Sequence, residues 1–260
     1  MHRSKIEWVK NPDSSQGYTW WVKNPYQIKK PVGIFLDDMS DWMGDYWPRE
    51  WTEAELQVMR DCPQHRFYTL TKQPQNLPKW SPFPDNCRVG ATVCNQEMAN
   101  KAIPTLMNIP ASKRYISIEP MLEPVDLSKV EFGRYLPEDK PYFVNALEDR
   151  YIFGDEGDIE LKKIDWLIIG ACTGTLEAMV SLADRLGIVA ERIIPLNNRR
   201  YTLQPKIEWV KEIVEAADRA GIPVFLKDNL KPSLFERLEL PRWARTPHSL
   251  TKLRQEIPLN

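Results

Sequence analysis

The chain has 260 residues, and its 35 Lys and Arg side chains almost balance its 36 Asp and Glu side chains, for a formal charge of −1. This balance excludes a protein-wide field that would attract a polyanion, so any contact with nucleic acid has to be local. The hydrophobic fraction of 42% is typical of a globular protein, and no apolar run reaches the roughly 18 residues that a membrane helix needs. No apolar block follows the first ten residues, so we expect a cytoplasmic protein without membrane contact.

Short apolar runs rich in β-branched and aromatic residues alternate with helix-like segments along the chain. Near-continuous apolar runs of this kind are typical of parallel strands that are buried on both faces. We predict six such strands, at residues 32–36, 67–70, 89–93, 114–118, 166–169 and 224–226. The helical periodicity predicts helices at residues 52–61 with Thr52 as N-cap, 96–106, 176–186 and 205–220. The fold class that this order indicates is α/β, with a parallel sheet that forms either a complete or incomplete barrel or an open doubly wound sheet.

Two stretches interrupt the βα rhythm. Residues 123–163 are rich in charge, proline and aromatic residues, and we interpret them as an insertion. Within the insertion, residues 142–147 and 151–160 are predicted to form a hairpin around Glu148 and Asp149. Residues 175–204 add a helix and a short strand at 192–196, which could cover the mouth of a pocket. We therefore expect one domain over residues 1–260, with this insertion and a C-terminal tail from about residue 231.

An ordered series of short blocks gives the chain a family resemblance. The blocks are Ser4-Lys5-Ile6-Glu7-Trp8, Gly17-Tyr18-Thr19-Trp20, Phe35-Leu36-Asp37-Asp38-Met39-Ser40-Asp41, Cys62-Pro63-Gln64-His65-Arg66-Phe67, Leu70-Thr71-Lys72-Gln73-Pro74, Ile118-Glu119-Pro120-Met121-Leu122 and Phe225-Leu226-Lys227. In this order they resemble the signature blocks of a phage protein family that carries the names gp thirty-seven and gp sixty-eight, a domain-of-unknown-function family. The resemblance implies a radical-SAM-like, incomplete TIM-type barrel, and it implies an iron-sulfur cluster with S-adenosylmethionine for the family as a whole.

The chain departs from the family where the cluster would bind. After Gly-Tyr-Thr-Trp the family carries three closely spaced cysteines, whereas this chain has no cysteine before Cys62. A cluster with one open iron needs three thiolates on one loop, and the four cysteines Cys62, Cys87, Cys94 and Cys172 are far apart in the sequence. We therefore expect neither the cluster nor S-adenosylmethionine as a cofactor, no metal site, and buried reduced thiols.

A short repeat lies where the cysteine loop should begin. The pentapeptide Trp8-Val9-Lys10-Asn11-Pro12 recurs identically as Trp21-Val22-Lys23-Asn24-Pro25. One hypothesis is a deletion that removed the cluster segment, natural or engineered, and the other is chance repetition with divergence.

The candidate site residues follow from the predicted strands. In a parallel barrel, functional side chains lie just past the C-terminal ends of the strands. As catalytic candidates we select Glu119, Lys72 and Lys227, because a carboxylate and two ammonium groups there would face one rim. The ligand-binding candidates at the same strand ends are Asp37, Asp38, Ser40, Thr71, Gln73, Asn95, Gln96, Thr173 and Asp228. Helix capping and rim salt bridges are the structural alternative for all of them.

Three functional hypotheses remain open at this point. The first is a member of the radical-SAM-like family that has lost its cluster loop but retains a pocket for a small polar or nucleotide-like ligand. The second is a non-catalytic module that binds nucleic acid or a protein. The third is a cluster-independent enzyme in which Glu119 works with Lys72 or Lys227 as acid and base.

Overall fold

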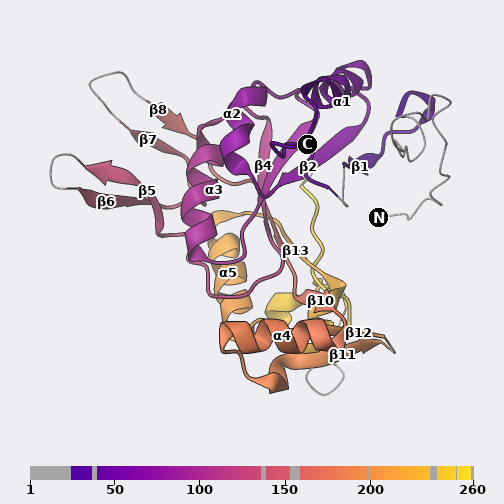
Figure 1. The fold of residues 1–260 in the computed structure, drawn as a ribbon, viewed down its shortest axis with the longest axis vertical. Coiled ribbons are helices and arrows are strands. Elements are labelled where there is room, and N and C mark those ends of the chain that lie inside the picture. The colour runs from indigo at the N-terminus through magenta and orange to yellow at the C-terminus, as the bar shows by residue number, and fades with distance from the viewer. Residues whose placement is uncertain are drawn as a thin grey trace.

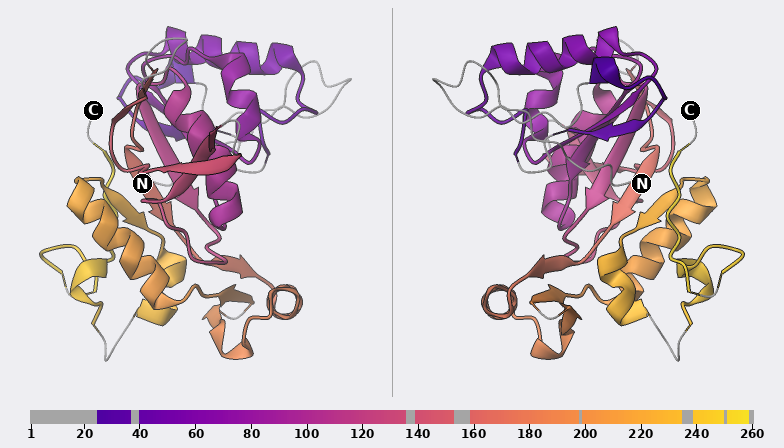
Figure 2. Two further views of the ribbon diagram at one scale, coloured as in Figure 1. Left: turned by 90° about the vertical axis from the view of Figure 1, so that its left-hand side faces the viewer. Right: turned by 90° about the vertical axis from the view of Figure 1, so that its right-hand side faces the viewer.

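The computed structural model describes residues 25–36, 40–135, 139–152, 159–197, 199–234, 239–249 and 251–258. Its centre is a sheet of six parallel strands whose spatial order follows their order in the chain, β1-β2-β3-β4-β9-β13. The strands are β1 (Gly33–Phe35), β2 (Arg66–Thr71), β3 (Cys87–Thr92), β4 (Lys113–Ile118), β9 (Trp166–Ile169) and β13 (Val224–Leu226). The sheet is curled into a half-barrel (Figures 1 and 2). The predicted parallel βα arrangement is therefore confirmed as a mixed α/β fold with a partial barrel.

Helices cover the outer face of the half-barrel. They are α1 (Arg49–Asp61), α2 (Leu77–Trp80), α3 (Gln96–Asn108) and α5 (Ile207–Ala220). Two further helices are α4 (Leu176–Leu186) and α6 (Lys231–Leu234). Buried side chains of α1, α3 and α5 pack with those of the strands in one continuous core. None of the described helices is long and apolar enough to cross a lipid bilayer.

Helix α1 begins earlier than its sequence pattern predicts. Thr52 is not the N-cap, because the helix starts at Arg49, directly after Pro48. The Thr52 hydroxyl is buried and donates to the carbonyl oxygen of Trp42 at 3.0 Å. The hydroxyl that the sequence pattern assigned to helix capping thus forms a tertiary hydrogen bond instead.

Aromatic side chains fill the inner face of the half-barrel. Tyr68, Tyr115 and Trp166 are buried together, with ring centroids 5.4 Å apart for Tyr115 and Trp166, and Phe225 packs against them. The phenol of Tyr115 donates to the carbonyl oxygen of Thr69 at 2.8 Å, which satisfies its buried hydroxyl. The interior is therefore a packed layer rather than a channel.

The chain between β4 and β9 forms two hairpins outside the six-stranded sheet. Strands β5 (Val130–Tyr135) and β6 (Lys140–Val144) pair with each other, as do β7 (Arg150–Ile152) and β8 (Ile159–Leu161). The predicted hairpin around Glu148 and Asp149 is wrong. Residues 140–144 pair with β5, which precedes them in the chain, and not with the residues that follow Asp149. The turn of the first hairpin includes Asp139 with φ of 51°, a conformation that the sequence pattern does not announce.

A second, smaller sheet lies beyond the C-terminal edge of the parallel strands (Figure 1). It is antiparallel, in the order β10 (Cys172–Gly174), β12 (Arg200–Leu203) and β11 (Ile193–Asn197), and α4 packs on one of its faces. The predicted short strand at 192–196 thus corresponds to β11. Because β10 follows β9 after only two residues, the small sheet is attached directly to the rim of the half-barrel.

The last described residues run along the edge strand of the half-barrel. Gln255 bridges Phe225 in antiparallel fashion, and the main-chain nitrogen of Leu226 donates to the carbonyl oxygen of Arg254 at 2.8 Å. The indole of Trp166 donates to the carbonyl oxygen of Glu256. The C-terminal segment thereby covers one open edge of the sheet, which would otherwise expose unpaired backbone groups.

Candidate site at the C-terminal edge of the sheet

Two oppositely charged side chains that follow parallel strands meet at the same point of the rim. Glu119 follows β4 and Lys227 follows β13, and the Nζ atom of Lys227 lies 2.6 Å from Oε2 of Glu119. The Glu119 side chain is 24% exposed and that of Lys227 is 42% exposed. The ion pair is therefore recessed but open to solvent, so it can be approached by a ligand.

A glycine makes this contact possible. Strand β9 lies between β4 and β13 in the sheet, and the residue that follows it is Gly170. A Cβ atom on Gly170 would lie 2.9 Å from Oε1 of Glu119, closer than real Cβ contacts allow. The carboxylate thus passes over Gly170, which has no side chain, and meets Lys227.

Asn229 holds the carboxylate from the other side. Its Nδ2 donates to the carbonyl oxygen of Ala171 at 2.8 Å and lies 3.3 Å from both Oε1 of Glu119 and Oγ1 of Thr173. Its Oδ1 accepts from the main-chain nitrogen of Ala171 at 3.1 Å. Both ends of the amide are used, so the orientation of the Asn229 side chain is fixed.

Asn229 contacts this candidate site, although the sequence prediction did not select it. It lies in a single turn of 3-10 helix, Asp228–Leu230, directly after Lys227. The prediction selected its neighbour Asp228, whose carboxylate instead pairs with Lys231 at 2.8 Å and is 71% exposed. The only sequence signal for Asn229 is its position two residues after Lys227. The sequence does not show whether the side chain of Asp228 or that of Asn229 points toward Glu119.

Lys72 projects from the same rim two strands away from Glu119. It follows β2, and its main-chain nitrogen donates to Oδ2 of Asp41 at 2.7 Å; the same oxygen accepts from Oγ1 of Thr71 at 3.0 Å. Asp41 therefore fixes the backbone from which Lys72 projects. The Lys72 side chain is exposed, and no carboxylate in the described part of the chain pairs with its ammonium group.

Two thiols lie within the electrostatic reach of these charges. Burial raises the pKa of Cys94 to about 11; the positive charge of Lys72 lowers this pKa, and Cys172 and Glu119 raise it. Burial also raises the pKa of Cys172, again with a contribution from Glu119. Lys72 and Glu119 thus act on the same thiol, which places both charges around one stretch of the rim.

Comparison with known proteins supplies a family. A protein family described as "Protein of unknown function (DUF5131)" matches residues 4–181, more than half of the chain. The chain belongs to this family. No curated protein and no solved structure matches the chain. For this DUF5131 chain, Glu119 lies inside the matched segment, whereas Lys227 and Asn229 lie beyond it.

The other predicted site residues of the DUF5131 chain have structural partners or lie elsewhere. Oδ1 of Asn95 accepts from the main-chain nitrogen of Met98 and caps α3, and Oε1 of Gln96 accepts from the main-chain nitrogen of Asp126, between β4 and β9. Gln73 donates through its main chain to Oγ1 of Thr71 at 2.9 Å. Ser40 is exposed, and Asp37 and Asp38 lie outside the described residues, as does the repeat up to Asn24.

The thiols of the DUF5131 chain do not fit an iron-sulfur cluster. Cys62 and Cys87 are buried at the N-terminal end of the sheet, and Cys94 and Cys172 follow the C-terminal ends of β3 and β9. The cysteine loop that the family resemblance implies would hold three thiolates together, whereas these four thiols are divided between the two ends of the sheet. Among the described residues, no group of three His, Cys, Asp or Glu side chains is placed to hold a metal ion.

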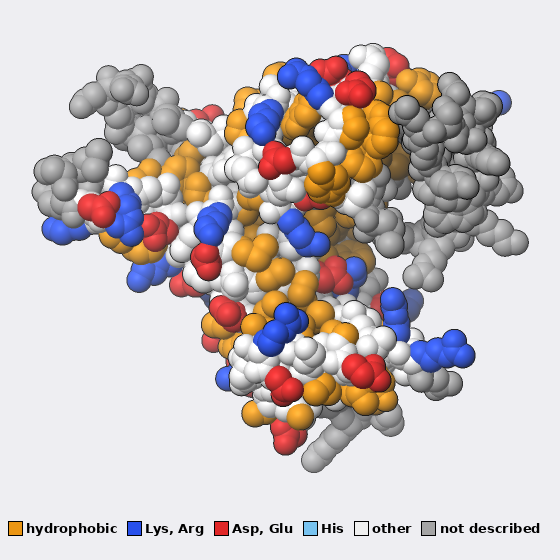
Figure 3. All heavy atoms as spheres, in the orientation of Figure 1, with side chains coloured by type: hydrophobic (Ala, Val, Ile, Leu, Met, Phe, Trp, Pro, Cys, Tyr) orange, Lys and Arg blue, Asp and Glu red, His pale blue; other side chains and the backbone are white. Residues whose placement is uncertain are grey.

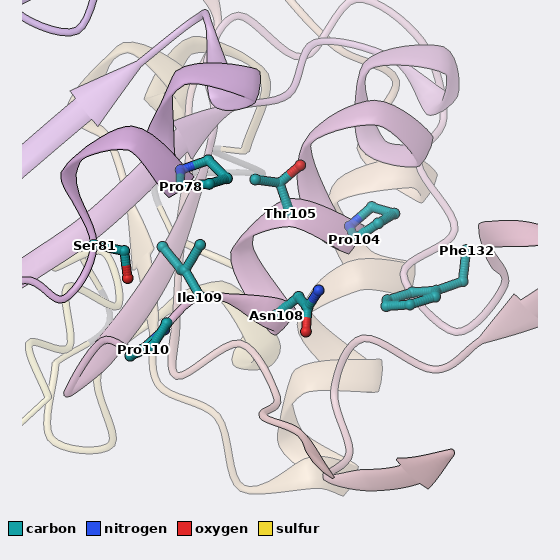
Figure 4. A pocket seen from close by; sticks show the side chains of 8 residues that line it. All are labelled: Pro78, Ser81, Pro104, Thr105, Asn108, Ile109, Pro110 and Phe132. Atoms are coloured by element: carbon teal, nitrogen blue, oxygen red, sulfur yellow. The ribbon is translucent and has the colours of Figure 1, made fainter. Parts of the chain in front are cut away.

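A hollow of about 490 Å³ lies away from the rim, along the C-terminal part of α3. Figure 4 shows the side chains that line it. It is lined by Pro78, Ser81, Pro104, Thr105, Asn108, Ile109, Pro110 and Phe132. Helix α3 runs back from the rim, so this groove belongs to the other end of the sheet, and it contains no charged side chain.

Proposed function

We propose that this chain is a radical-SAM-like half-barrel protein of the phage type that has lost its cluster loop and binds a small anionic ligand at the C-terminal rim of its sheet. The observation that carries the proposal is the fixed Glu119–Lys227 pair, 2.6 Å apart over Gly170. The phage and radical-SAM relationships are supported by the order of the sequence blocks and by a parallel half-barrel that is compatible with that fold.

The chemistry of the rim favours an anion with hydrogen-bond acceptors. An ammonium group has three donors. Lys227 uses one of them on Glu119, and Lys72 uses none on a described side chain, so both retain donors for a phosphate or carboxylate. Glu119 holds the Lys227 side chain in place. Lys227 therefore loses fewer conformations when it binds a ligand than an unpaired lysine would.

An acid-base enzyme is the second candidate. Donor and acceptor atoms 2.6 Å apart are within the distance at which a proton can move between an amine and a carboxylate. In this function Glu119 and Lys227 would exchange a proton with the substrate, and Lys72 would hold the substrate by its charge.

The binding proposal is tested by isothermal titration calorimetry with adenosine monophosphate, inorganic phosphate and S-adenosylmethionine as probes. Lys72→Ala is the informative variant, because Lys72 has no described partner and its loss should leave stability within about 0.5 kcal/mol. We expect it to weaken binding of the phosphate probes about tenfold, since a charge-assisted contact contributes about 1.5 kcal/mol.

Lys140→Ala is the matched control, because Lys140 is also exposed and lies on β6 of the insertion. It should leave binding unchanged. Equal affinities of wild type, Lys72→Ala and Lys227→Met for every probe would refute the proposed site. If Glu119→Gln abolished a turnover but retained binding, the acid-base function would be favoured.

A further inference from the structure

The hairpin of β11 and β12 ends in two arginines. Asn197 pairs with Arg200 at this end, and Oδ1 of Asn197 accepts from the main-chain nitrogens of Arg199 and Arg200, each at 3.1 Å. Both arginines are exposed. Neither guanidinium forms an ion pair with a carboxylate in the described part of the chain, in contrast to Arg134, Arg245 and Arg254.

The hairpin is connected to the rim site through its own sheet. Thr173 of β10 lies opposite Thr202 of β12, and Oγ1 of Thr173 accepts from Asn229. Side chains alternate along a strand, so Arg200 and Thr202 lie on the same face of the sheet. This face is the one that meets Asn229, and Arg200 is two residues, about 7 Å, farther from the site along β12.

The arrangement extends the positive charge of the rim outward. Figure 3 shows Lys and Arg side chains projecting at the free end of the β11–β12 hairpin. Because Arg200 lies two residues beyond Thr202, a chain of regularly spaced anionic groups could contact both Lys227 and the arginines of the hairpin. Guanidinium groups pair with phosphate in a bidentate geometry, and a strand of nucleic acid carries one phosphate for every nucleotide along its length.

We propose that a single strand of nucleic acid binds across the hairpin and the rim, with its phosphodiester backbone on Arg199 and Arg200 and one nucleotide at Lys227 and Lys72. This proposal rests on the anion site proposed above and names the class of its ligand. The formal charge of the whole chain is −1, so the attraction is local to these residues.

The test is fluorescence anisotropy with labelled oligothymidylate and oligouridylate of about 12 nucleotides, a length within the usual range of single-strand sites. The affinity is measured between about 50 and 200 mM salt, where each phosphate contact contributes roughly 0.7 to the slope of log K against log salt. Replacing both arginines, Arg199→Ala with Arg200→Ala, should move this slope toward zero by about 1.4. Comparing the two oligomers shows whether DNA or RNA is preferred.

The matched control is Arg60→Ala with Arg219→Ala. These arginines are also exposed, but they lie in the last turns of α1 and α5, at the opposite end of the sheet. The control should leave both affinity and slope unchanged. Equal slopes for the two double variants would overturn the proposal, and so would displacement of the oligomer by polyglutamate at equal charge concentration, which would indicate an acidic protein partner.

The failure of this proposal can be distinguished from that of the anion site. If adenosine monophosphate binds in a manner that depends on Lys72 but the hairpin variant leaves oligomer affinity unchanged, only the nucleic-acid proposal is wrong. If the hairpin variant lowers oligomer affinity but no mononucleotide binds, the rim is not an independent anion site and the contact belongs to the hairpin alone.

Discussion

The α-carbon of Gly170 and the carboxylate of Glu119 approach so closely that a methyl group between them would lie 2.9 Å from Oε1. Gly170→Ala should therefore push the carboxylate away from Lys227 and Asn229 without altering any charged residue. We expect a loss of about 1 to 3 kcal/mol of stability, as for other overpacked positions, together with weaker binding of adenosine monophosphate. Urea denaturation and calorimetry measure the two effects.

The control for this substitution is Gly90→Ala on β3. Its added methyl would lie 2.3 Å from the Tyr115 ring on the inner face, so it should also destabilise the fold but leave the rim unchanged. If both variants weaken binding in proportion to their loss of stability, Gly170 has no specific role at the site.

The Glu119–Lys227 pair should couple the two side chains only modestly. The pair is partly exposed, so solvent screens it, and we expect a coupling free energy of about 1 kcal/mol. A double-mutant cycle with Glu119→Gln, Lys227→Met and the double variant measures this value by urea denaturation. A coupling of about 3 kcal/mol or more would indicate a structural pair rather than a ligand site.

The parallel strands of the fold were predictable because burial on both faces leaves a continuous apolar run in each of them. The same rule placed Glu119 and Lys227 at one edge, since both follow such strands. It could not place the β5–β6 hairpin, because its turn at Asp139 carries no glycine signal and its pairing depends on a strand, β5, that the sequence pattern did not reveal.

The remainder of the site depends on tertiary approach. Asn229 reaches the carboxylate only because the turn after β13 packs against the residues that follow β9. Gln96 was expected at the ligand site because it follows a strand, but its side-chain oxygen accepts from the main-chain nitrogen of Asp126, in the segment between β4 and β9. A strand-end rule identifies the edge, whereas the direction of each side chain is decided by partners distant in sequence.

Iron should not bind to the purified protein. The four thiols are divided between the two ends of the sheet, so anaerobic reconstitution with iron and sulfide should leave the protein colourless. Iron analysis and a visible absorption spectrum provide the measurement. About four irons per chain with charge-transfer absorption would contradict this expectation, and would require thiols of two chains to combine.

Alkylation of Cys94 should report the charges around the rim. With its pKa raised to about 11, this thiol is almost entirely protonated at pH 8, and its rate of reaction with iodoacetamide is proportional to the small thiolate fraction. The ammonium of Lys72 lowers this pKa, so Lys72→Met should raise it and slow the reaction. The carboxylate of Glu119 has the opposite effect, so Glu119→Gln should speed it.

Mass spectrometry of the modified peptides separates Cys94 from Cys172, and Lys140→Met serves as the control of equal charge change. Rates for Cys94 that are the same in all four proteins would mean that Lys72 and Glu119 do not surround one stretch of the rim.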